Sequence, residues 1–272
     1  MPVTTRGPVP LKYADRGEGE PTLLLMPGWC ATQKMWQRVE PRLARRHRVL
    51  SLDWRGHGRS APHDGDFTEQ GLVQDARAVI DGARAASVVP VAAAHAGWVA
   101  IDLRRTLGDR IAAIVLLDWI VGPAPPAFLN ALGALQDEDR WRPTVDALID
   151  DWRAGSDDRV LLSFLEDMRG VDADMWHRAG REIDKAYARE GAPLDALVGL
   201  APPVPVLHLY SQPADDEYLA VQEEFARRHP WFAVRRLPAQ THYPQLEAPD
   251  EVASSIDEFV EQASAAPLAH AA

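Results

Sequence analysis

The sequence predicts an α/β protein in which a mostly parallel sheet is flanked by helices and carries one inserted helical cap. Two observations support this fold class. Short apolar runs bounded by turn residues alternate with segments of helical periodicity, and one long stretch in the second half of the chain carries helical patterns alone. Apolar runs without polar alternation are typical of strands buried on both faces, and alternation of strands and helices indicates βαβ units.

The expected elements follow one another along the chain. Strands are expected at residues 22–26, 49–53, 88–92, 111–117, 204–210 and 232–237. Helices are expected at residues 34–43, 68–86, 97–107, 218–228 and 249–261. The last helix has proline at its start, where the missing backbone N–H would have no helical partner anyway.

The long helical stretch divides the chain into a core, a cap and a tail. The expected ranges are 1–119 with 204–263 for the core domain, 120–203 for the helical cap and 264–272 for a disordered, alanine-rich tail. The cap carries large apolar side chains at Trp141, Trp152, Met168 and Trp176. They would attach the cap to the core, and a cap above strand ends would also enclose an apolar pocket.

Composition restricts the classes of partner. The 272 residues carry a net charge of -11, which opposes binding to nucleic acid or anionic lipid because both are negative themselves. No stretch reaches the roughly 18 apolar residues that span a bilayer. The single cysteine, Cys30, fits a reducing compartment. We therefore expect a cytoplasmic protein that binds a small molecule and has neither a nucleic-acid nor a membrane partner.

A strand-to-helix junction built from small residues is the most informative local pattern. Residues 89–98 read VPVAAAHAGW, and such small residues permit the tight turn called the nucleophile elbow, whose usual signature is G-x-S-x-G. The register here is Ala92, Ala93, Ala94, His95 and Ala96. Because Ala94 has no nucleophilic atom, no acyl-enzyme can form there. On these residues alone, a crowded strand–helix junction without function is an equal alternative.

Two further loops follow strands. In the α/β-hydrolase fold, a backbone N–H of the loop after the first parallel strand and the N–H that follows the nucleophile form the oxyanion hole. The sequence MPGWC at 26–30 occupies that loop, so the candidate donors are the amides of Trp29 and His95. The sequence DWRGHGRS at 53–60 matches the D-x-R-G-x-G loop of this fold. We interpret it as a scaffold of turns and ion pairs, with His57 structural.

The loop before the last helix carries a candidate base. In the α/β-hydrolase fold the triad histidine lies there, and QTHYP at 240–244 contains His242. Two places qualify for the acid: Asp118 follows the strand before the cap, whereas Asp215 and Asp216 follow the strand after it, the commoner location. The elbow, the two loops and His242 together predict an α/β-hydrolase fold.

Metal and phosphate motifs are missing from the sequence. It contains no H-E-x-x-H, no closely spaced cysteine pair, no clustered histidine and carboxylate set and no glycine-rich phosphate loop. We expect no metal and no organic cofactor, so any chemistry would depend on His242, backbone donors and the substrate.

Several short motifs together resemble the cofactor-free 2,4-dioxygenases of 3-hydroxy-4-oxoquinolines, which have the α/β-hydrolase fold. The motifs are PGWC, H-x-GWV, LLDW, DDW, SQP, HPWF and THYP, and the similarity runs from about residue 21 to residue 259. The resemblance implies that dioxygen opens an N-heteroaromatic ring, with release of carbon monoxide and an N-acylanthranilate and without metal or organic cofactor. Small aromatic substrate and dioxygen are the implied partners.

The resemblance also implies roles for individual residues. The base of the family corresponds to His242 and its acid to Asp118. His242 would take the proton of the 3-hydroxyl, and Asp118 would orient the imidazole and stabilise the resulting imidazolium. The substrate anion would then donate an electron to dioxygen directly.

The remaining implied roles concern the pocket. The amides of Trp29 and His95 would surround the oxygen species, and Trp29 would also contact the substrate. Trp152 resembles a stacking platform of the family for the bicyclic ring, and Trp176 resembles a second aromatic wall.

Three departures from the family pattern predict the kind of substrate. Family members have serine at the position of Ala94, and they can have histidine at the positions of Ala31 and Ala93. Loss of three polar groups makes the pocket more apolar. This favours a 2-alkyl-3-hydroxy-4(1H)-quinolone of the bacterial quorum-sensing type and places Ala94 in the substrate-binding set.

Two other hypotheses concern the same residues. One is an esterase or lyase of the same fold that uses water activated by His242, or a nucleophile such as Cys30. The other is a pseudoenzyme that only binds a small ligand. Ala94 opposes acyl chemistry, and retention of His242 with Asp118 opposes an idle site. No residue pattern predicts an oligomeric state.

Overall fold

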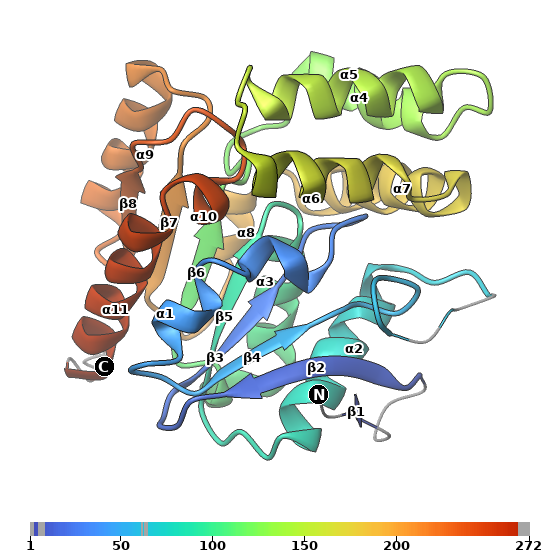
Figure 1. Ribbon diagram of the computed structural model, residues 1–272. Helices are drawn as coiled ribbons and strands as arrows, with labels where there is room; N and C mark the ends of the chain where they lie inside the picture. Colours follow the sequence, from blue (N-terminus) through green and yellow to red (C-terminus); the bar gives the residue numbers. More distant parts are fainter. Residues whose placement is uncertain (1–2, 5–8, 61, 63–64, 266–272) are drawn as a thin grey trace.

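The computed structural model describes residues 3–4, 9–60, 62 and 65–265. Within these ranges eight strands form one sheet in the order β1-β2-β4-β3-β5-β6-β7-β8 (Figure 1). The parallel strands are β3 (Thr22–Met26), β4 (Val49–Leu52), β5 (Val88–Ala93), β6 (Ile114–Leu117), β7 (Val206–Tyr210) and β8 (Phe232–Arg236). The mostly parallel sheet predicted from the sequence is confirmed.

Two antiparallel strands at one edge of the sheet were not predicted. β1 (Val3–Thr4) pairs with β2 (Leu11–Arg16), and β2 pairs with β4. β2 buries Leu11 and Tyr13 but exposes Asp15 and Arg16. Because β2 mixes polar and apolar residues, it lacks the continuous apolar run by which the buried parallel strands were identified.

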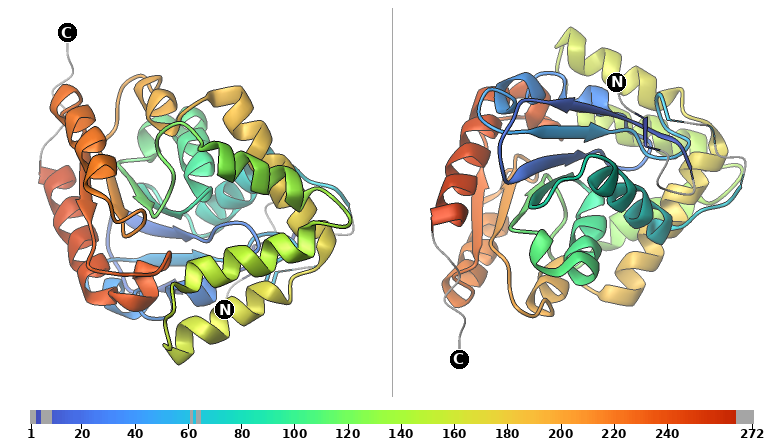
Figure 2. Two further views of the ribbon diagram at one scale, coloured as in Figure 1. Left: turned by 90° about the horizontal axis from the view of Figure 1, so that it is seen from above. Right: turned by 90° about the horizontal axis from the view of Figure 1, so that it is seen from below.

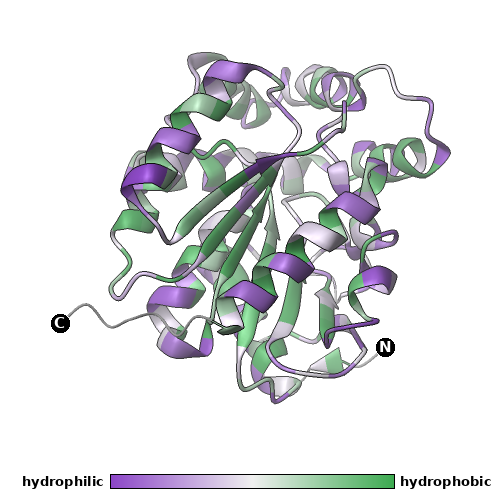
Figure 3. Cartoon of the chain, turned by 90° about the vertical axis from the view of Figure 1, so that its left-hand side faces the viewer, coloured by the Kyte–Doolittle hydropathy of each residue, from purple (hydrophilic) through white to green (hydrophobic). Residues whose placement is uncertain are grey.

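The sheet interior is apolar because helices cover both of its faces. Every residue of β3, β4, β5, β6 and β7 is buried, whereas β8 at the edge buries only Phe232. Figure 3 shows hydrophobic strands between helices whose hydrophilic residues face outward. Burial on both faces explains why these strands read as apolar runs without alternation.

Helices pack against the two faces of the sheet. α1 (Glu40–Leu43) packs against α11 (Pro249–Ala265), and α2 (Glu69–Gly82) packs against α3 (Ala96–Leu107). The view from below in Figure 2 places α2 and α3 across the central strands from α1. α9 (Asp216–Arg228) packs against β8 at the edge. No helix in the described ranges combines the length and hydropathy that a membrane crossing requires.

Several expected boundaries were wrong: the helix expected at 68–86 ends at Gly82, and the strand expected at 111–117 begins at Ile114. The helix expected at 34–43 is a 3-10 turn, η1 (Gln33–Trp36), followed by the short α1. The interruption has a local cause, because Pro41 has no N–H with which to continue a helix from residue 37. The last helix continues to Ala265, so Ser264 and Ala265 are helical rather than part of a tail. Residues 266–272 lie outside the described residues.

Five helices lie between β6 and β7. They are α4 (Pro126–Leu135), α5 (Trp141–Arg153), α6 (Arg159–Arg169), α7 (Ala173–Glu190) and α8 (Pro193–Val198). Asp158 starts α6 by accepting hydrogen bonds from the amides of Val160 and Leu161. Figures 1 and 2 show α4 to α7 lying across one end of the sheet, the end at which the parallel strands finish.

Ion pairs connect these helices to the core. Arg38 Nη1 lies 2.8 Å from Asp158 Oδ2, and Lys34 Nζ lies 2.6 Å from Asp167 Oδ2. Arg189 Nη2 on α7 lies 2.9 Å from Glu69 Oε1, at the start of α2. The layer therefore rests on the core through charged contacts at its rim and apolar packing inside.

Candidate active site

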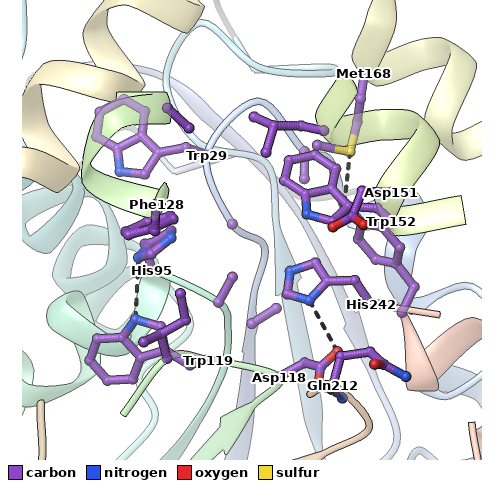
Figure 4. Close-up of a pocket in the computed structure, with 18 of the residues that line it drawn as sticks. Trp29, His95, Asp118, Trp119, Phe128, Asp151, Trp152, Met168, Gln212 and His242 are labelled. Atoms are coloured by element: carbon purple, nitrogen blue, oxygen red, sulfur yellow. Dashed lines mark hydrogen bonds and ion pairs between the residues drawn. The ribbon is translucent and has the colours of Figure 1, made fainter. Parts of the chain in front are cut away.

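A cavity of about 700 Å³ lies between the carboxyl ends of the parallel strands and the layer of α4 to α7. Side chains from both sides line it, among them Trp29, Ala94, His95, Asp118, Trp152, Trp176 and His242. In Figure 4, Trp29, Phe128 and His95 lie on one side and Trp152 and His242 on the other. The structure thus brings these seven candidate residues together at the sheet edge where open α/β folds bind ligands, whereas Asp215, Asp216 and Cys30 are not among the lining residues.

The side chains of His242 and Asp118 pair in the wall of this cavity. His242 Nδ1 lies 3.1 Å from Asp118 Oδ2, and the side chain of Asp118 is 3% exposed against 24% for His242. Asp118 directly follows β6 and has a positive φ of 48°. Such backbone strain is tolerated where surrounding contacts over-determine it, commonly at functional sites.

The backbone after β7 holds the Asp118 carboxylate. Asp118 Oδ1 accepts hydrogen bonds from the amides of Ser211 at 2.7 Å and Gln212 at 3.1 Å. Hydrogen bonds of this kind stabilise the ionised carboxylate. The alternative acid, Asp215, instead accepts from the amide of Tyr218 at 2.6 Å and caps α9. The amides directly after β7 therefore contact the Asp118 carboxylate, while the carboxylate of Asp215 caps a helix.

Ser211 is a site residue that the sequence analysis did not single out. Its hydroxyl oxygen lies 3.0 Å from Asp118 Oδ2 and 2.7 Å from the carbonyl oxygen of Thr241, the residue before His242. One hydroxyl group thus links the acid to the loop that carries the histidine. The motif SQP is visible in the sequence, but nothing local reveals this contact.

His242 also contacts the layer above it. Its imidazole stacks on Trp152, with ring centroids 5.6 Å apart and an interplanar angle of 25°. Trp152 in turn stacks on Trp176 at 6.5 Å and 28°. The histidine and the two tryptophans therefore form one aromatic wall, which suits a flat ring.

The elbow has the backbone geometry of a tight strand-to-helix turn. Ala94 has a positive φ of 47°, and its amide donates to the carbonyl of Leu117 at 2.8 Å. A Cβ built on Gly28 would lie 3.6 Å from the Ala94 Cβ, so the loop after β3 lies directly against the elbow. Ala31 and Ala93, the other two departures from the family pattern, also line the cavity.

Two backbone amides are free to face the cavity. Within the described part of the chain, neither Trp29 nor His95 uses its amide in a hydrogen bond to another residue. One lies on the loop after β3 and the other directly after Ala94, as in the oxyanion hole of this fold. Paired donors of this kind can stabilise negative charge on oxygen.

The His95 imidazole is neutral and has a defined tautomer. Burial lowers its pKa to about 3, with a further contribution from the charge of His242. Trp119 Nε1 donates to His95 Nδ1 at 3.2 Å, so the ring proton of His95 is on Nε2. Trp119 fits there because a Cβ on Gly97 would lie 2.3 Å from its ring. The sequence contains both residues, but only packing connects them.

Cys30 and His57 are not among the residues that line the cavity. Burial raises the pKa of the Cys30 thiol well above its usual range, which disfavours a thiolate nucleophile. His57 is buried and both of its ring nitrogens face backbone groups. Among the described residues, no group of three or more histidine, cysteine, aspartate or glutamate side chains could together hold a metal ion.

The sequence and the fold are similar to those of known proteins. A model of the alpha/beta hydrolase family matches residues 23–255. A 2-heptyl-3-hydroxy-4(1H)-quinolone dioxygenase of Mycobacteroides abscessus is 37% identical over 249 residues, which cover 90% of this chain and 93% of that protein. A 1H-3-hydroxy-4-oxoquinoline 2,4-dioxygenase of Pseudomonas putida is 35% identical over 254 residues, which cover 92% and 96% respectively.

One solved structure is similar over nearly the whole chain. It contains an AqdC variant in complex with its substrate, and it concerns recognition and ring cleavage of the Pseudomonas quinolone signal. The two structures have a TM-score of 0.92 at 35% sequence identity, and the match covers 96% of this chain and 99% of the other.

Proposed function

The chain belongs to the alpha/beta hydrolase family and, within that fold, to the 3-hydroxy-4-quinolone dioxygenases, and on this premise we propose its substrate and mechanism. The substrate is a 2-alkyl-3-hydroxy-4(1H)-quinolone, and the products are carbon monoxide and an N-acylanthranilate. The observation that carries the proposal is the His242–Asp118 pair, 3.1 Å apart, in the aromatic wall of a cavity whose elbow carries Ala94.

His242 is the general base. Its Nδ1 faces Asp118, so Nε2 is the atom that accepts the proton of the 3-hydroxyl. Asp118 stabilises the imidazolium that forms. A positioned base of this kind contributes about 10² to 10⁴ in rate. No nucleophile is required at position 94, because the deprotonated substrate itself reacts with oxygen.

The substrate anion supplies the electrons for the oxygen chemistry. It donates an electron to dioxygen, and bonds then form between oxygen and the two ring carbons that flank the hydroxyl-bearing carbon. The O–O bond and the two bonds to the hydroxyl-bearing carbon then break. That carbon leaves as carbon monoxide with its own oxygen, and both atoms of dioxygen remain in the N-acylanthranilate. The amides of Trp29 and His95 stabilise the negative charge that develops on oxygen.

The shape and polarity of the cavity favour an alkylated substrate. Trp152 and Trp176 offer a stacking surface for the bicyclic ring. Apolar side chains of α4, α5 and α7 also line the cavity, among them Phe128, Leu132, Leu135, Leu148 and Ile183. Ala31, Ala93 and Ala94 add further apolar surface to the lining. A hydrocarbon chain of several carbons gains free energy by leaving water for such surroundings, about 0.8 kcal/mol per buried CH₂.

The proposal includes the setting in which the enzyme acts. Its partners are the small aromatic substrate and dioxygen, without metal or organic cofactor and without nucleic acid. It acts in the cytoplasm, with residues 120–203 as a cap over the 1–119 and 204–263 core. The single cysteine and the net charge of -11 support this setting.

An oxygen-consumption assay tests the function. Protein treated with a chelator is mixed in air with 2-heptyl-3-hydroxy-4(1H)-quinolone, and carbon monoxide and N-octanoylanthranilate are measured. We expect turnover by the wild type, a loss of about 10² to 10⁴ in His242→Ala, and a higher kcat/KM for the 2-heptyl than for the 2-methyl substrate. Near wild-type turnover by His242→Ala would refute the role of His242 as general base. Preference for the methyl substrate would remove the alkyl assignment, and efficient hydrolysis of aryl esters would favour an esterase.

A further inference from the structure

Two loops that lie apart in the sequence are joined beneath the candidate site. We define the oxyanion loop as residues 27–33 and the support loop as residues 53–60. Trp54 Nε1 donates to the carbonyl of Pro27 at 2.7 Å. At the other end of the oxyanion loop, the amide of Gln33 donates to Asp53 Oδ1 at 2.8 Å. The support loop therefore holds the oxyanion loop at both ends.

The third connection is made by His57 at the centre. The amide of Cys30 donates to His57 Nε2 at 3.1 Å. His57 Nδ1 lies 2.8 Å from the carbonyl oxygen of Arg55, to which it must donate. The imidazole therefore carries its proton on Nδ1 and accepts at Nε2, and burial lowers its pKa, which favours this neutral form.

The residue held by this bond is conformationally strained. Cys30 has a positive φ of 60°, an uncommon conformation for a residue with a side chain. The peptide bond pinned by His57 is the one that joins Trp29 to Cys30. The Trp29 ring also meets the His57 ring edge-on at 6.3 Å and stacks on Phe67 at 5.6 Å. The orientation of Trp29 thus depends on contacts with His57 on both its backbone and its ring.

The support loop is itself rigidly closed. A Cβ on Gly58 would lie 2.6 Å from the Asp53 carboxylate, and the amide of Arg59 donates to Asp53 Oδ2 at 3.1 Å. The His57 amide donates to the Trp54 carbonyl at 3.0 Å. His57 is therefore presented to the oxyanion loop from a fixed base.

We propose that His57 is a positioning residue that aims the Trp29 amide at the oxygen-centred charge formed during ring cleavage. The proposal rests on the function proposed above and adds a residue that does not touch the substrate. Removal of an oxyanion-hole donor costs about 10² to 10³ in kcat. Because a lost His57 bond displaces the Trp29 donor without removing it, we expect a smaller loss, about tenfold.

Two variants of similar polarity test the proposal. In His57→Gln, the amide oxygen reaches as far as Nε2 and can still accept from Cys30. In His57→Asn, the shorter amide reaches only as far as Nδ1. We expect the glutamine variant to keep kcat within about threefold of the wild type and the asparagine variant to lose about tenfold, with KM for the quinolone nearly unchanged in both.

A control separates positioning from general damage to the support loop. Within the same loop, Ser60 Oγ donates to the carbonyl of Asp53 at 2.6 Å and accepts from the amide of Lys12 at 2.9 Å, and among the described residues it makes no hydrogen bond to the oxyanion loop. We expect Ser60→Ala to lower Tm without lowering kcat. Equal kcat in the glutamine and asparagine variants would overturn the role of His57, as would a kcat loss that merely follows Tm in all three variants. An inactive wild type would instead overturn the proposed function, and this inference with it.

Discussion

The Asp118 carboxylate presents one oxygen to His242 and the other to the backbone after β7. Oδ2 lies 3.1 Å from His242 Nδ1, while Oδ1 accepts from the amides of Ser211 and Gln212. The two oxygens are therefore not interchangeable, and an amide in place of the carboxylate has only one satisfactory orientation.

Asp118→Asn should abolish most of the turnover while the fold is kept. The backbone amides require an oxygen at the Oδ1 position, so the asparagine NH₂ group would face His242 and donate to Nδ1. The proton of His242 would then be on Nε2, and the substrate hydroxyl would have no acceptor. We expect kcat to fall by about 10² to 10⁴ with little change in KM. Single-turnover experiments measure the loss of rate in the chemical step.

Asp215→Asn provides the matched control for that variant. Asp215 caps α9 through the amide of Tyr218, and asparagine is an equally good capping residue. We expect wild-type kcat and a change in Tm of at most a few degrees. A large loss of turnover in this variant would reopen the assignment of the acid.

Ser211→Ala should weaken the link between the acid and the histidine loop. The hydroxyl lies within 3.0 Å of Asp118 Oδ2 and 2.7 Å of the Thr241 carbonyl, and its removal leaves a buried acceptor with one partner fewer. We expect a loss of about 1 to 3 kcal/mol in unfolding free energy and a kcat loss much smaller than in Asp118→Asn. Denaturant unfolding and steady-state kinetics measure the two effects, and unchanged values of both would refute the link.

Trp152→Ala should affect both binding and catalysis, because the ring stacks on His242 as well as facing the cavity. Aromatic pairs contribute about 0.5 to 1.5 kcal/mol beyond the burial of apolar area, so we expect KM for the quinolone to rise by about 2- to 12-fold. We also expect kcat to fall, because the stacked ring no longer holds the imidazole of His242 in place. Trp152→Phe should recover most of both. If the phenylalanine variant behaved like the alanine variant, stacking would not be the relevant interaction.

Glu69 predicts a pH dependence of stability. Burial raises its pKa from 4.5 to about 7, against the opposing charge of Arg189, and its side chain is only 4% exposed. Because the folded pKa exceeds the unfolded one, the contribution of Glu69 is complete below pH 4.5 and is lost as the pH rises through about 7. At 1.36 kcal/mol per pH unit between pH 4.5 and about pH 7, the loss is about 3 to 4 kcal/mol.

Glu69→Gln removes this titration, so the stability of the wild type relative to the variant should fall between pH 5 and pH 8. Denaturant unfolding at both pH values measures it. Asp66→Asn is the control, because ion pairing with Arg181 and Arg178 lowers the pKa of Asp66 to about 2, well below this window. We expect the difference in unfolding free energy between wild type and Asp66→Asn to be the same at pH 5 and pH 8. If the difference between wild type and Glu69→Gln were also the same at both pH values, the prediction would be contradicted.

Local sequence patterns predicted the parallel strands because burial on both faces leaves a continuous apolar run. The same criterion missed β2, whose outer half faces solvent. It also joined η1 and α1 into one helix, because apolar periodicity continues through the segment that Pro41 interrupts. Errors of this kind occur where an edge or a single backbone N–H, rather than the hydrophobic pattern, decides the structure.

The sequence by itself determined the fold class, the lack of a nucleophile at Ala94 and the position of His242 before the last helix. Each of these depends on residues that are near neighbours in the chain. Only the tertiary structure decided that His242 pairs with Asp118 while Asp215 caps a helix, that Trp119 sets the tautomer of His95, and that His57 holds the amide of Cys30. Those relations are distances between segments far apart in the chain. They exist only once the sheet has brought its strand ends together, and no local pattern encodes them.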